Sequence, residues 1–415
     1  MIVKPFMGYR PRPDIAAKVA LNPNNLLSEP ERRDSAKKNP YSFAHVVKPR
    51  IDFPEQTSKT EKQLFEHAKL YFNKLCDEGI LIRDKVPCFY IYRLSLDNHT
   101  QTGLISCLNL KNYFEGKIKK HEHTRSEKEI ENLLHIQSTR LNSNPVFLAY
   151  PAIRDIDNLV ASITKSRQPE YNFTSDLGVL QQLWIVSDLQ IIEQLRQLFD
   201  QRVPVTYIAD GHHRAAAAAL YAQQMEKEWS GKTQFEDYNY FLTCLFPSNQ
   251  LRIFDYNRVV KDLNGLSERD FLKKLNEKFE VREASRTPYD PHEPHRFGMF
   301  LGNKWFKLKS KDGTFIIDPI GSLDVTILQQ NVLAPILGIK DPRLDKRIDF
   351  VPGIRGLSAL EKPVIKGKAA VAFSLFPVTM EQLFAVSDMG EVMPPKSTWF
   401  EPKLMSGLVI FKMEV

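Results

Sequence analysis

The sequence predicts a mixed α/β or α+β protein with a mixed sheet as its core. Short runs rich in β-branched and aromatic residues alternate with segments whose apolar residues recur at helical spacing. The alternation lacks the strict order of repeated βαβ units, so the sheet is not expected to be purely parallel. The 415 residues, 42% of them apolar and 26% charged, suffice for two or three domains with sizeable cores.

The elements follow from local patterns. Residues 1–55 are rich in proline, which predicts an extended segment packed over a core. The clearest helix covers 61–77, and Gly79 ends it. Strands at 88–93 and 102–108 follow on either side of a turn. Further strands are predicted at 145–150, 171–174, 179–186, 203–209, 240–246 and 251–254, helices after Asp188 and over 215–229 and 263–279, and a hairpin at 305–308 and 314–317.

Charge and cysteine content exclude several classes of protein. The net charge is +7, but the basic residues are spread along the chain among acids, which favours anionic small molecules over nucleic acid. The four cysteines form no C-x-x-C pair, so structural zinc, an Fe–S cluster and a disulfide framework are not expected. No signal peptide or long apolar run is apparent, and a cytoplasmic protein without a membrane partner is the expectation.

The most informative stretch is the run Asp210, Gly211, His212, His213, Arg214, where a predicted strand meets an alanine-rich helix. Backbone N–H groups and the positive end of the helix dipole favour an anion at such a junction, and glycine permits close approach. The guanidinium suits phosphate, and imidazoles exchange protons near neutral pH. A simple capped helix with solvent-facing histidines is the alternative, but four clustered polar side chains favour a functional site.

A second charged run, 119–129, places Glu122 between His121 and His123. A glutamate flanked by cations is a good general base, because its surroundings set its proton affinity. The simpler interpretation is a solvated helix face that Thr124 or Ser126 caps. The run alone does not decide between the two.

Two dense stretches lie near the C-terminus, at 341–356 and 390–400. The second has the spacing of a phosphate-binding loop, but Pro395 replaces its second glycine and removes an N–H donor, which argues against a Walker loop. Lys396, Ser397 and Thr398 remain candidates for separate phosphate contacts, and a polar loop beside an edge strand is the alternative.

Nearly the full length resembles a broad bacterial family, the domain of unknown function numbered ten-fifteen. The resembling runs are 4–6, 39–43, 119–122, 209–214, 345–349 and 393–400, the last reading Met-Pro-Pro-Lys-Ser-Thr-Trp-Phe. An eight-residue run of this kind is specific. Family membership by itself says little about chemistry.

The run 210–214 also resembles a motif of the ParB and sulfiredoxin-like superfamily, above all of the free-serine kinases. The run 119–122 resembles their Lys-x-His-Glu element. The resemblance implies nucleotide-binding elements of that superfamily with added helices, and Glu122 as the base that takes a proton from a serine hydroxyl. It implies that Asp210, Gly211, His212, His213 and Arg214 hold the phosphates of ATP or ADP with Mg²⁺, Asp210 being the metal ligand. Further phosphate contacts are predicted from His121, Lys346, Arg347, Lys396, Ser397 and Thr398.

One departure from the family concerns a run Pro-Tyr-Asp-Val, where this chain has Pro23, Asn24, Asn25 and Leu26. If this loop holds a substrate ammonium or a metal, altered specificity or reduced activity is expected. Three regions are predicted: an extended segment at 1–55, a catalytic region at 56–256, and a C-terminal region at 257–415 that completes the site.

The sequence thus predicts a kinase of a small hydroxyl metabolite, with free L-serine as the favoured acceptor and O-phosphoserine as product. Two alternatives stay open. One is a ParB-like nucleotide-binding module without catalysis, and the other is a metal-dependent hydrolase with zinc held by His121, His123, His212 and His213. The phosphate donor, the acceptor and the oligomeric state are not fixed by the sequence.

Overall fold

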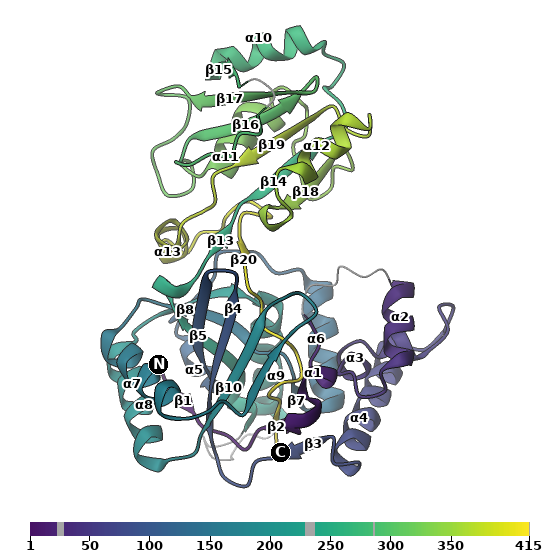
Figure 1. Cartoon of the computed structure of the whole chain (residues 1–415), viewed down its shortest axis with the longest axis vertical. Helices are drawn as coiled ribbons and strands as arrows, with labels where there is room; N and C mark the ends of the chain where they lie inside the picture. The colour runs from purple at the N-terminus through teal and green to yellow at the C-terminus, as the bar shows by residue number, and fades with distance from the viewer. Residues whose placement is uncertain (23–28, 229–236, 285–286, 415) are drawn as a thin grey trace. The chain divides into compact units, whose positions relative to one another are not determined.

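The computed structural model describes residues 1–22, 29–228, 237–284 and 287–414 (Figure 1). The chain divides into two compact units, the first formed by Met1–Leu251 with Pro402–Val415 and the second by Arg252–Glu401. The second unit therefore ends at Glu401, and the last residues of the predicted 257–415 region belong to the first unit. Asn24 and Asn25 lie outside the described residues.

The core of the first unit is a nine-stranded mixed sheet (Figure 1). Its strands run in the order β6 (Ile118–Lys119), β11 (Thr206–Asp210), β8 (Val146–Tyr150), β12 (Tyr240–Pro247), β5 (His99–Asn109), β4 (Phe89–Leu96), β10 (Leu180–Val186) and β9 (Tyr171–Thr174), with β1 (Val3–Lys4) paired to β5. The pairs β6–β11 and β8–β12 are parallel and the others antiparallel. The predicted mixed α/β fold is confirmed.

Two groups of helices pack in this unit (Figure 1). One group consists of α4 (Glu61–Asp77), α6 (Ser126–Thr139) and α9 (His212–Glu228), and the other of α7 (Arg154–Ser166) and α8 (Leu189–Arg202). The helix predicted at 61–77 has those bounds, and Thr60 caps it with a capping box. Helix α6 begins after Arg125, so neither Thr124 nor Ser126 is its N-cap. The shorter helices are α1 (Ala16–Val19), α2 (Glu29–Lys38), α3 (Ala44–Val47) and α5 (Lys111–Phe114).

The two ends of the chain are held in the first unit by short strand pairs. These are β2 (Tyr9–Pro11) with β3 (Leu81–Arg83), and β7 (Leu141–Asn142) with β21 (Phe411–Lys412). Tyr9 also exchanges two backbone hydrogen bonds with Ile410. These contacts fix the path of residues 402–415 through the first unit.

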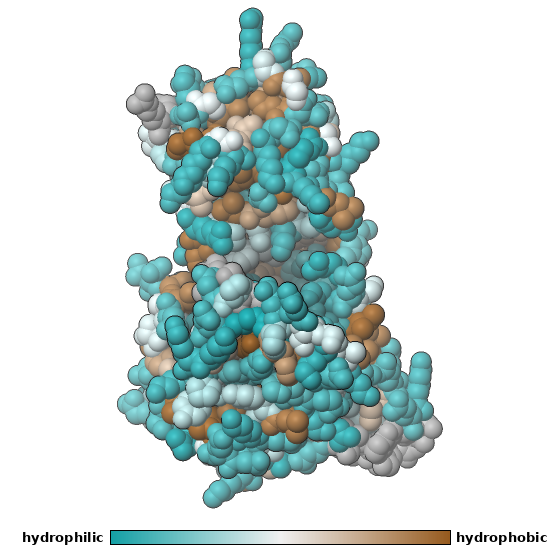
Figure 2. All heavy atoms as spheres, turned by 90° about the vertical axis from the view of Figure 1, so that its right-hand side faces the viewer, coloured by the Kyte–Doolittle hydropathy of each residue, from teal (hydrophilic) through white to brown (hydrophobic). Residues whose placement is uncertain are grey.

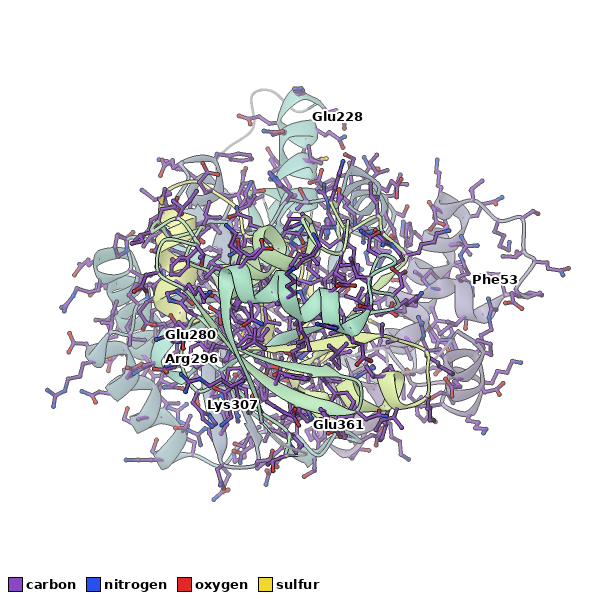
Figure 3. The ribbon with its side chains drawn as sticks, turned by 90° about the horizontal axis from the view of Figure 1, so that it is seen from above. Phe53, Glu228, Glu280, Arg296, Lys307 and Glu361 are labelled. Carbon is purple, nitrogen blue, oxygen red and sulfur yellow. The ribbon has the colours of Figure 1, made fainter. Side chains whose placement is uncertain are left out.

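The second unit is built on a six-stranded antiparallel sheet. Its order is β15 (Phe279–Glu283), β17 (Lys304–Ser310), β16 (Arg296–Leu301), β19 (Val371–Leu375), β14 (Tyr256–Val260) and β18 (Ile348–Pro352), with helices α10 (Glu268–Lys278), α11 (Asp324–Leu328), α12 (Ser358–Ile365) and α13 (Met380–Asp388). Glu280, Arg296 and Lys307 share one face, as the register requires (Figure 3). A separate pair, β13 (Ile253–Phe254) and β20 (Trp399–Phe400), lies at the unit's ends.

Two predictions for this unit are wrong in detail. Strand β17 pairs with β15 and β16, and residues 314–317 form no strand, so the predicted hairpin does not exist. The turn residues after 310 end β17 without starting a partner strand. Helix α10 begins at Glu268 and not near 263, because the Ser267 hydroxyl accepts a hydrogen bond from the Asp270 N–H and caps it there.

Within the described ranges, no helix has both the length and the apolar character needed to cross a bilayer. Figure 2 shows that hydrophilic side chains dominate the visible face and that apolar ones occur in small groups.

Asp324 at the start of α11 provides a test of the second unit. Its side chain is buried, and its Oδ1 accepts a hydrogen bond from the His295 N–H at 2.8 Å. Burial raises the pKa of Asp324 to about 7, although the N–H groups of His295 and Phe376 oppose the rise. Because the folded state then binds a proton more tightly than the unfolded chain, this residue's contribution is most favourable below pH 4 and is lost between about pH 4 and 7.

We therefore expect Asp324→Asn to stabilise the second unit at pH 8 by on the order of 3 kcal/mol and to change little at pH 4. Urea unfolding at both pH values measures the difference. Asp312→Asn, on an exposed turn of the same unit, is the matched control and is expected to be neutral at both. Equal effects of Asp324→Asn at the two pH values would contradict the assignment.

Candidate functional site

The parallel pairing of β6 with β11 brings the two polar motifs together. Ile118 lies opposite Thr206, and Lys119 lies opposite Tyr207. Parallel strands deliver the chain to the same edge of a sheet, so the residues that follow each strand adjoin. Glu122 Oε2 lies 3.8 Å from His212 Nδ1, and the Arg125 N–H donates a hydrogen bond to His213 Nδ1 at 3.3 Å. The two segments therefore converge at one edge of the sheet.

Gly211 makes the turn between β11 and α9. Its φ of +100° lies in the region that favours glycine. A Cβ at this position would lie 2.7 Å from Arg214 Nη2, so the guanidinium occupies the space that a side chain would need. Helix α9 begins at His212, three residues before the predicted start, which places both histidines in its first turn.

Arg214 folds back over this turn and holds the end of β11 in place. Its Nη2 pairs with Asp210 Oδ2 at 2.6 Å, and its Nη1 donates to the carbonyl oxygens of Asn144 and Pro145 at 3.0 and 2.6 Å. These contacts involve two of the three guanidinium nitrogens. In this structure Arg214 therefore orders the strand end that precedes the helix.

Asp210 is shared between two cations. Lys403 Nζ lies 3.2 Å from its Oδ1, and the Lys403 side chain is only 15% exposed. Burial alone would raise the pKa of Asp210, but the Lys403 ammonium and the Arg214 guanidinium hold it well below its usual range. Asp210 is therefore ionised at neutral pH.

Lys403 was not predicted as a site residue. It reaches the site because residues 402–415 return to the first unit after the second unit is complete. A single lysine between Pro402 and Leu404 carries no local pattern, so only the tertiary path of the chain reveals it.

The two buried histidines differ from the predicted proton-exchanging groups. The side chains of His121 and His212 are 3% and 5% exposed, and their rings meet edge to face with centroids 4.6 Å apart. Burial lowers the pKa of His121 to about 4. Burial and the neighbouring His121 lower the pKa of His212 well below its usual value. Both rings are therefore neutral at pH 7, and His212 Nε2 forms no hydrogen bond with any described residue.

His213 has a more open setting. It is half-buried, and burial together with the nearby Arg125 lowers its pKa. A neutral imidazole at the start of a helix adds no charge of its own, so the positive charge at this edge comes from lysine and arginine side chains, among them Lys403, Arg214 and Arg125. An incoming anion would meet these cations and the first N–H groups of α9, those of His212 and His213, whereas the Arg214 N–H donates to the Gly211 carbonyl.

The histidines do not form a metal centre with other residues. Across the described parts of the chain, no three His, Cys, Asp or Glu side chains are grouped as metal ligands. Both oxygens of Asp210 already have cationic partners, so this arrangement does not fit a metal held directly by Asp210. The zinc-hydrolase alternative therefore gains no support from these side chains.

The remaining predicted phosphate contacts lie in the second unit. Arg347 pairs with Asp345 at 2.8 Å and with Asp262 at 3.4 Å. The Ser397 hydroxyl is buried and donates to the Pro394 carbonyl at 2.6 Å, and Lys396 Nζ lies 5.7 Å from the centre of the Tyr256 ring. Lys346 is exposed, and its carbonyl accepts a hydrogen bond from Lys261. Phosphate binding by these residues and by Thr398 stays a prediction.

Residues 3–326 match the model of the family DUF1015, described as a protein of unknown function. The chain belongs to this family. The match covers the first unit up to Leu251 and part of the second, and it confirms the resemblance to family ten-fifteen. The description assigns no chemistry.

Curated sequences and solved structures were also compared with this chain. No curated protein sequence matches. Among solved structures, free serine kinase in complex with AMP is 12% identical with a TM-score of 0.36, covering 75% of this chain and 91% of that one. A conserved hypothetical protein from Pyrococcus furiosus is 14% identical with a TM-score of 0.35 (74% and 95% covered). A truncated SbnI from Staphylococcus aureus is 12% identical with a TM-score of 0.36 (72% and 85%). At these values no residue role or substrate is transferred to this chain.

The turn at Gly211 generates a prediction. Gly211→Ala adds a side chain to a backbone with positive φ and pushes it against the Arg214 guanidinium, so the protein is expected to lose on the order of 3 kcal/mol of unfolding free energy. Gly178→Ala is the matched control, because Gly178 also has positive φ but a Cβ there would meet no atom within 4 Å. It is expected to cost about 1 kcal/mol. Urea unfolding measures both losses. Equal losses would show that contact between the new side chain and the Arg214 guanidinium contributes nothing to the loss.

Proposed function

We propose that this protein is a kinase that transfers a phosphoryl group from ATP or ADP to the hydroxyl of a small metabolite, with free L-serine as the acceptor. The observation that carries the proposal is the position of Glu122. Its carboxylate lies 3.8 Å from His212, beside the strand-to-helix junction of residues 210–214. A carboxylate next to a site suited to phosphate is the arrangement that phosphoryl transfer to an alcohol needs.

Glu122 supplies the base. Its side chain is 52% exposed, so an acceptor can approach it, whereas the adjoining histidine is buried. In the proposed step the acceptor oxygen attacks the terminal phosphorus, and a new O–P bond forms while the bond to the leaving nucleotide oxygen breaks. The hydroxyl proton passes to Glu122, which must come within about 3 Å of it or act through one water.

The start of α9 supplies the phosphate site. Its first-turn N–H groups and the helix dipole favour the charge that spreads over the transferred oxygens. Lys403 adds a positive charge that a phosphate would share with Asp210. A Mg²⁺ carried by the nucleotide phosphates is part of the substrate and needs no ligand set from the protein.

The choice of serine rests on the resemblance of residues 119–122 and 210–214 to the motifs of free-serine kinases. The rival function is a module that binds nucleotide and does not catalyse transfer. Both functions use the same junction, and they differ in whether O-phosphoserine appears.

The test is turnover by the purified protein with Mg²⁺, ATP or ADP, and L-serine, with O-phosphoserine measured by mass spectrometry. Glu122→Gln keeps the size of the side chain and removes its proton affinity, so kcat is expected to fall at least about a hundredfold, while nucleotide affinity stays the same. Glu127→Gln, an equally exposed glutamate at the start of α6, is the matched control and is expected to leave kcat unchanged.

Unchanged turnover in Glu122→Gln would remove this residue from the mechanism. Nucleotide binding without product in the unaltered protein, across several hydroxyl-bearing acceptors, would favour the binding module.

A further inference from the structure

A polar cavity lies in the first unit and is lined mainly by residues of α7, β4 and β5. It measures about 90 Å³. Its polar lining comes from Arg93, Thr102, Tyr150, Asp157 and Gln250. A volume of this size accommodates several water molecules, at roughly 10–15 Å³ each, or a ligand of similar heavy-atom count.

This cavity is separate from the candidate site. Asp210 lies opposite Phe147 near the start of β8, whereas Tyr150 is at the other end of that strand, roughly 10 Å away along the chain. Strands β5 and β4 are the third and fourth from β11 in the sheet, which adds roughly 14 to 19 Å across the strands. One ligand of metabolite size cannot fill both places.

Arg93 borders the cavity without a carboxylate partner. Its Nε donates to Thr102 Oγ1 at 3.1 Å and its Nη2 to Thr164 Oγ1 at 2.9 Å, and the guanidinium lies 4.9 Å from the Trp184 ring. In the described ranges no acid pairs with it. Burial lowers the pKa of Arg93, and no nearby anion offsets the shift. The Arg93 guanidinium is held in place by the two threonines and can bind a carboxylate through two hydrogen bonds.

Asp157 borders the same cavity from the first turn of α7. Its neighbour Asp155 pairs with Arg202, but Asp157 forms no ion pair with a described residue. Burial raises the pKa of Asp157, again without a charged partner. The cavity therefore has one uncompensated positive and one uncompensated negative group on its wall.

Each charge has a structural use by itself. An aspartate in the first turn of a helix interacts favourably with the helix dipole. An arginine that lies over an indole ring gains a cation–π contact. Neither use explains why opposite charges border one cavity without forming an ion pair with each other. Partly buried charges without partners cost folding free energy, and a ligand that carries both complementary charges would offset both costs at once.

We propose that this cavity is a binding site for a small α-amino acid. The ligand's carboxylate pairs with Arg93, and its ammonium pairs with Asp157. The two charged groups and the cavity volume fit a zwitterion with a short side chain. The site is independent of the kinase proposal, because it shares no residue with the edge formed by Glu122 and residues 210–214.

The test compares three ligands by calorimetry on the full chain: L-alanine, propionate, which lacks the ammonium, and ethylamine, which lacks the carboxylate. L-Alanine is expected to bind at least about tenfold more tightly than either fragment, because each charge-assisted hydrogen bond contributes about 1.5 kcal/mol or more. L-Alanine has no hydroxyl and cannot be a phosphoryl acceptor, so binding does not depend on kinase activity.

Three variants test where the amino acid binds. Asp157→Asn keeps the shape and removes the charge, so the preference for L-alanine over propionate is expected to vanish. Asp155→Asn, in the same helical turn but paired with Arg202, is the matched control and should keep the preference. Glu122→Gln should also keep it. Equal affinity for L-alanine and propionate in the unaltered protein, no binding of L-alanine at millimolar concentration, or loss of binding only in Glu122→Gln would each overturn the proposal.

Discussion

The parallel pairing of β6 with β11 is the constraint on which the candidate site depends. Only two residues of β6 form the strand, yet they fix where the chain leaves the sheet. An antiparallel neighbour would have sent residues 120–125 to the opposite edge, away from the start of α9. The short pairing therefore determines that Glu122 and His212 are neighbours, and the proposed chemistry follows from that proximity.

A second feature is the distribution of charge at this edge. Asp210 is held ionised by one cation from its own motif and one from the C-terminal segment. The two buried imidazoles are neutral, so they shape the site without adding positive charge. Affinity for an anion would then come from backbone N–H groups and from the release of a cation from Asp210. Because one carboxylate is shared by two cations, these three side chains carry a net positive charge when no anion is bound.

Much of the fold follows from local sequence patterns. The helix at 61–77 and the strands around 88–108 were predictable because their apolar periodicity, caps and turn residues agree. The junction at 210–214 was predictable for the same reason, since a β-rich run stops at a glycine before a run of alanines. The helix starts three residues early because the positive φ of Gly211 lets the backbone turn at once.

Other features depend on contacts that no local pattern contains. Lys403 meets Asp210 only through the tertiary path of the chain, and the neutrality of His121 and His212 depends on burial from several elements. The strand at 304–310 was expected to pair with the residues after it, but its partners are strands before it in the sequence. The pairing of this strand with β16 is a local hairpin across Gly302 and Asn303, which both have positive φ. Its pairing with β15 is long-range and is set by the sheet.

The pair β13–β20 has a consequence for how the chain is assembled. Ile253 lies opposite Phe400 and Phe254 opposite Trp399, so the residues that enter and leave the second unit are hydrogen-bonded to each other. In the order of the chain, the second unit is an insertion into the first, and the strand pair β13–β20 joins the start of the insertion to its end. Residues 252–401 could therefore be deleted as one segment and replaced by a short connector. The first unit would keep its nine-stranded sheet and both ends of the chain.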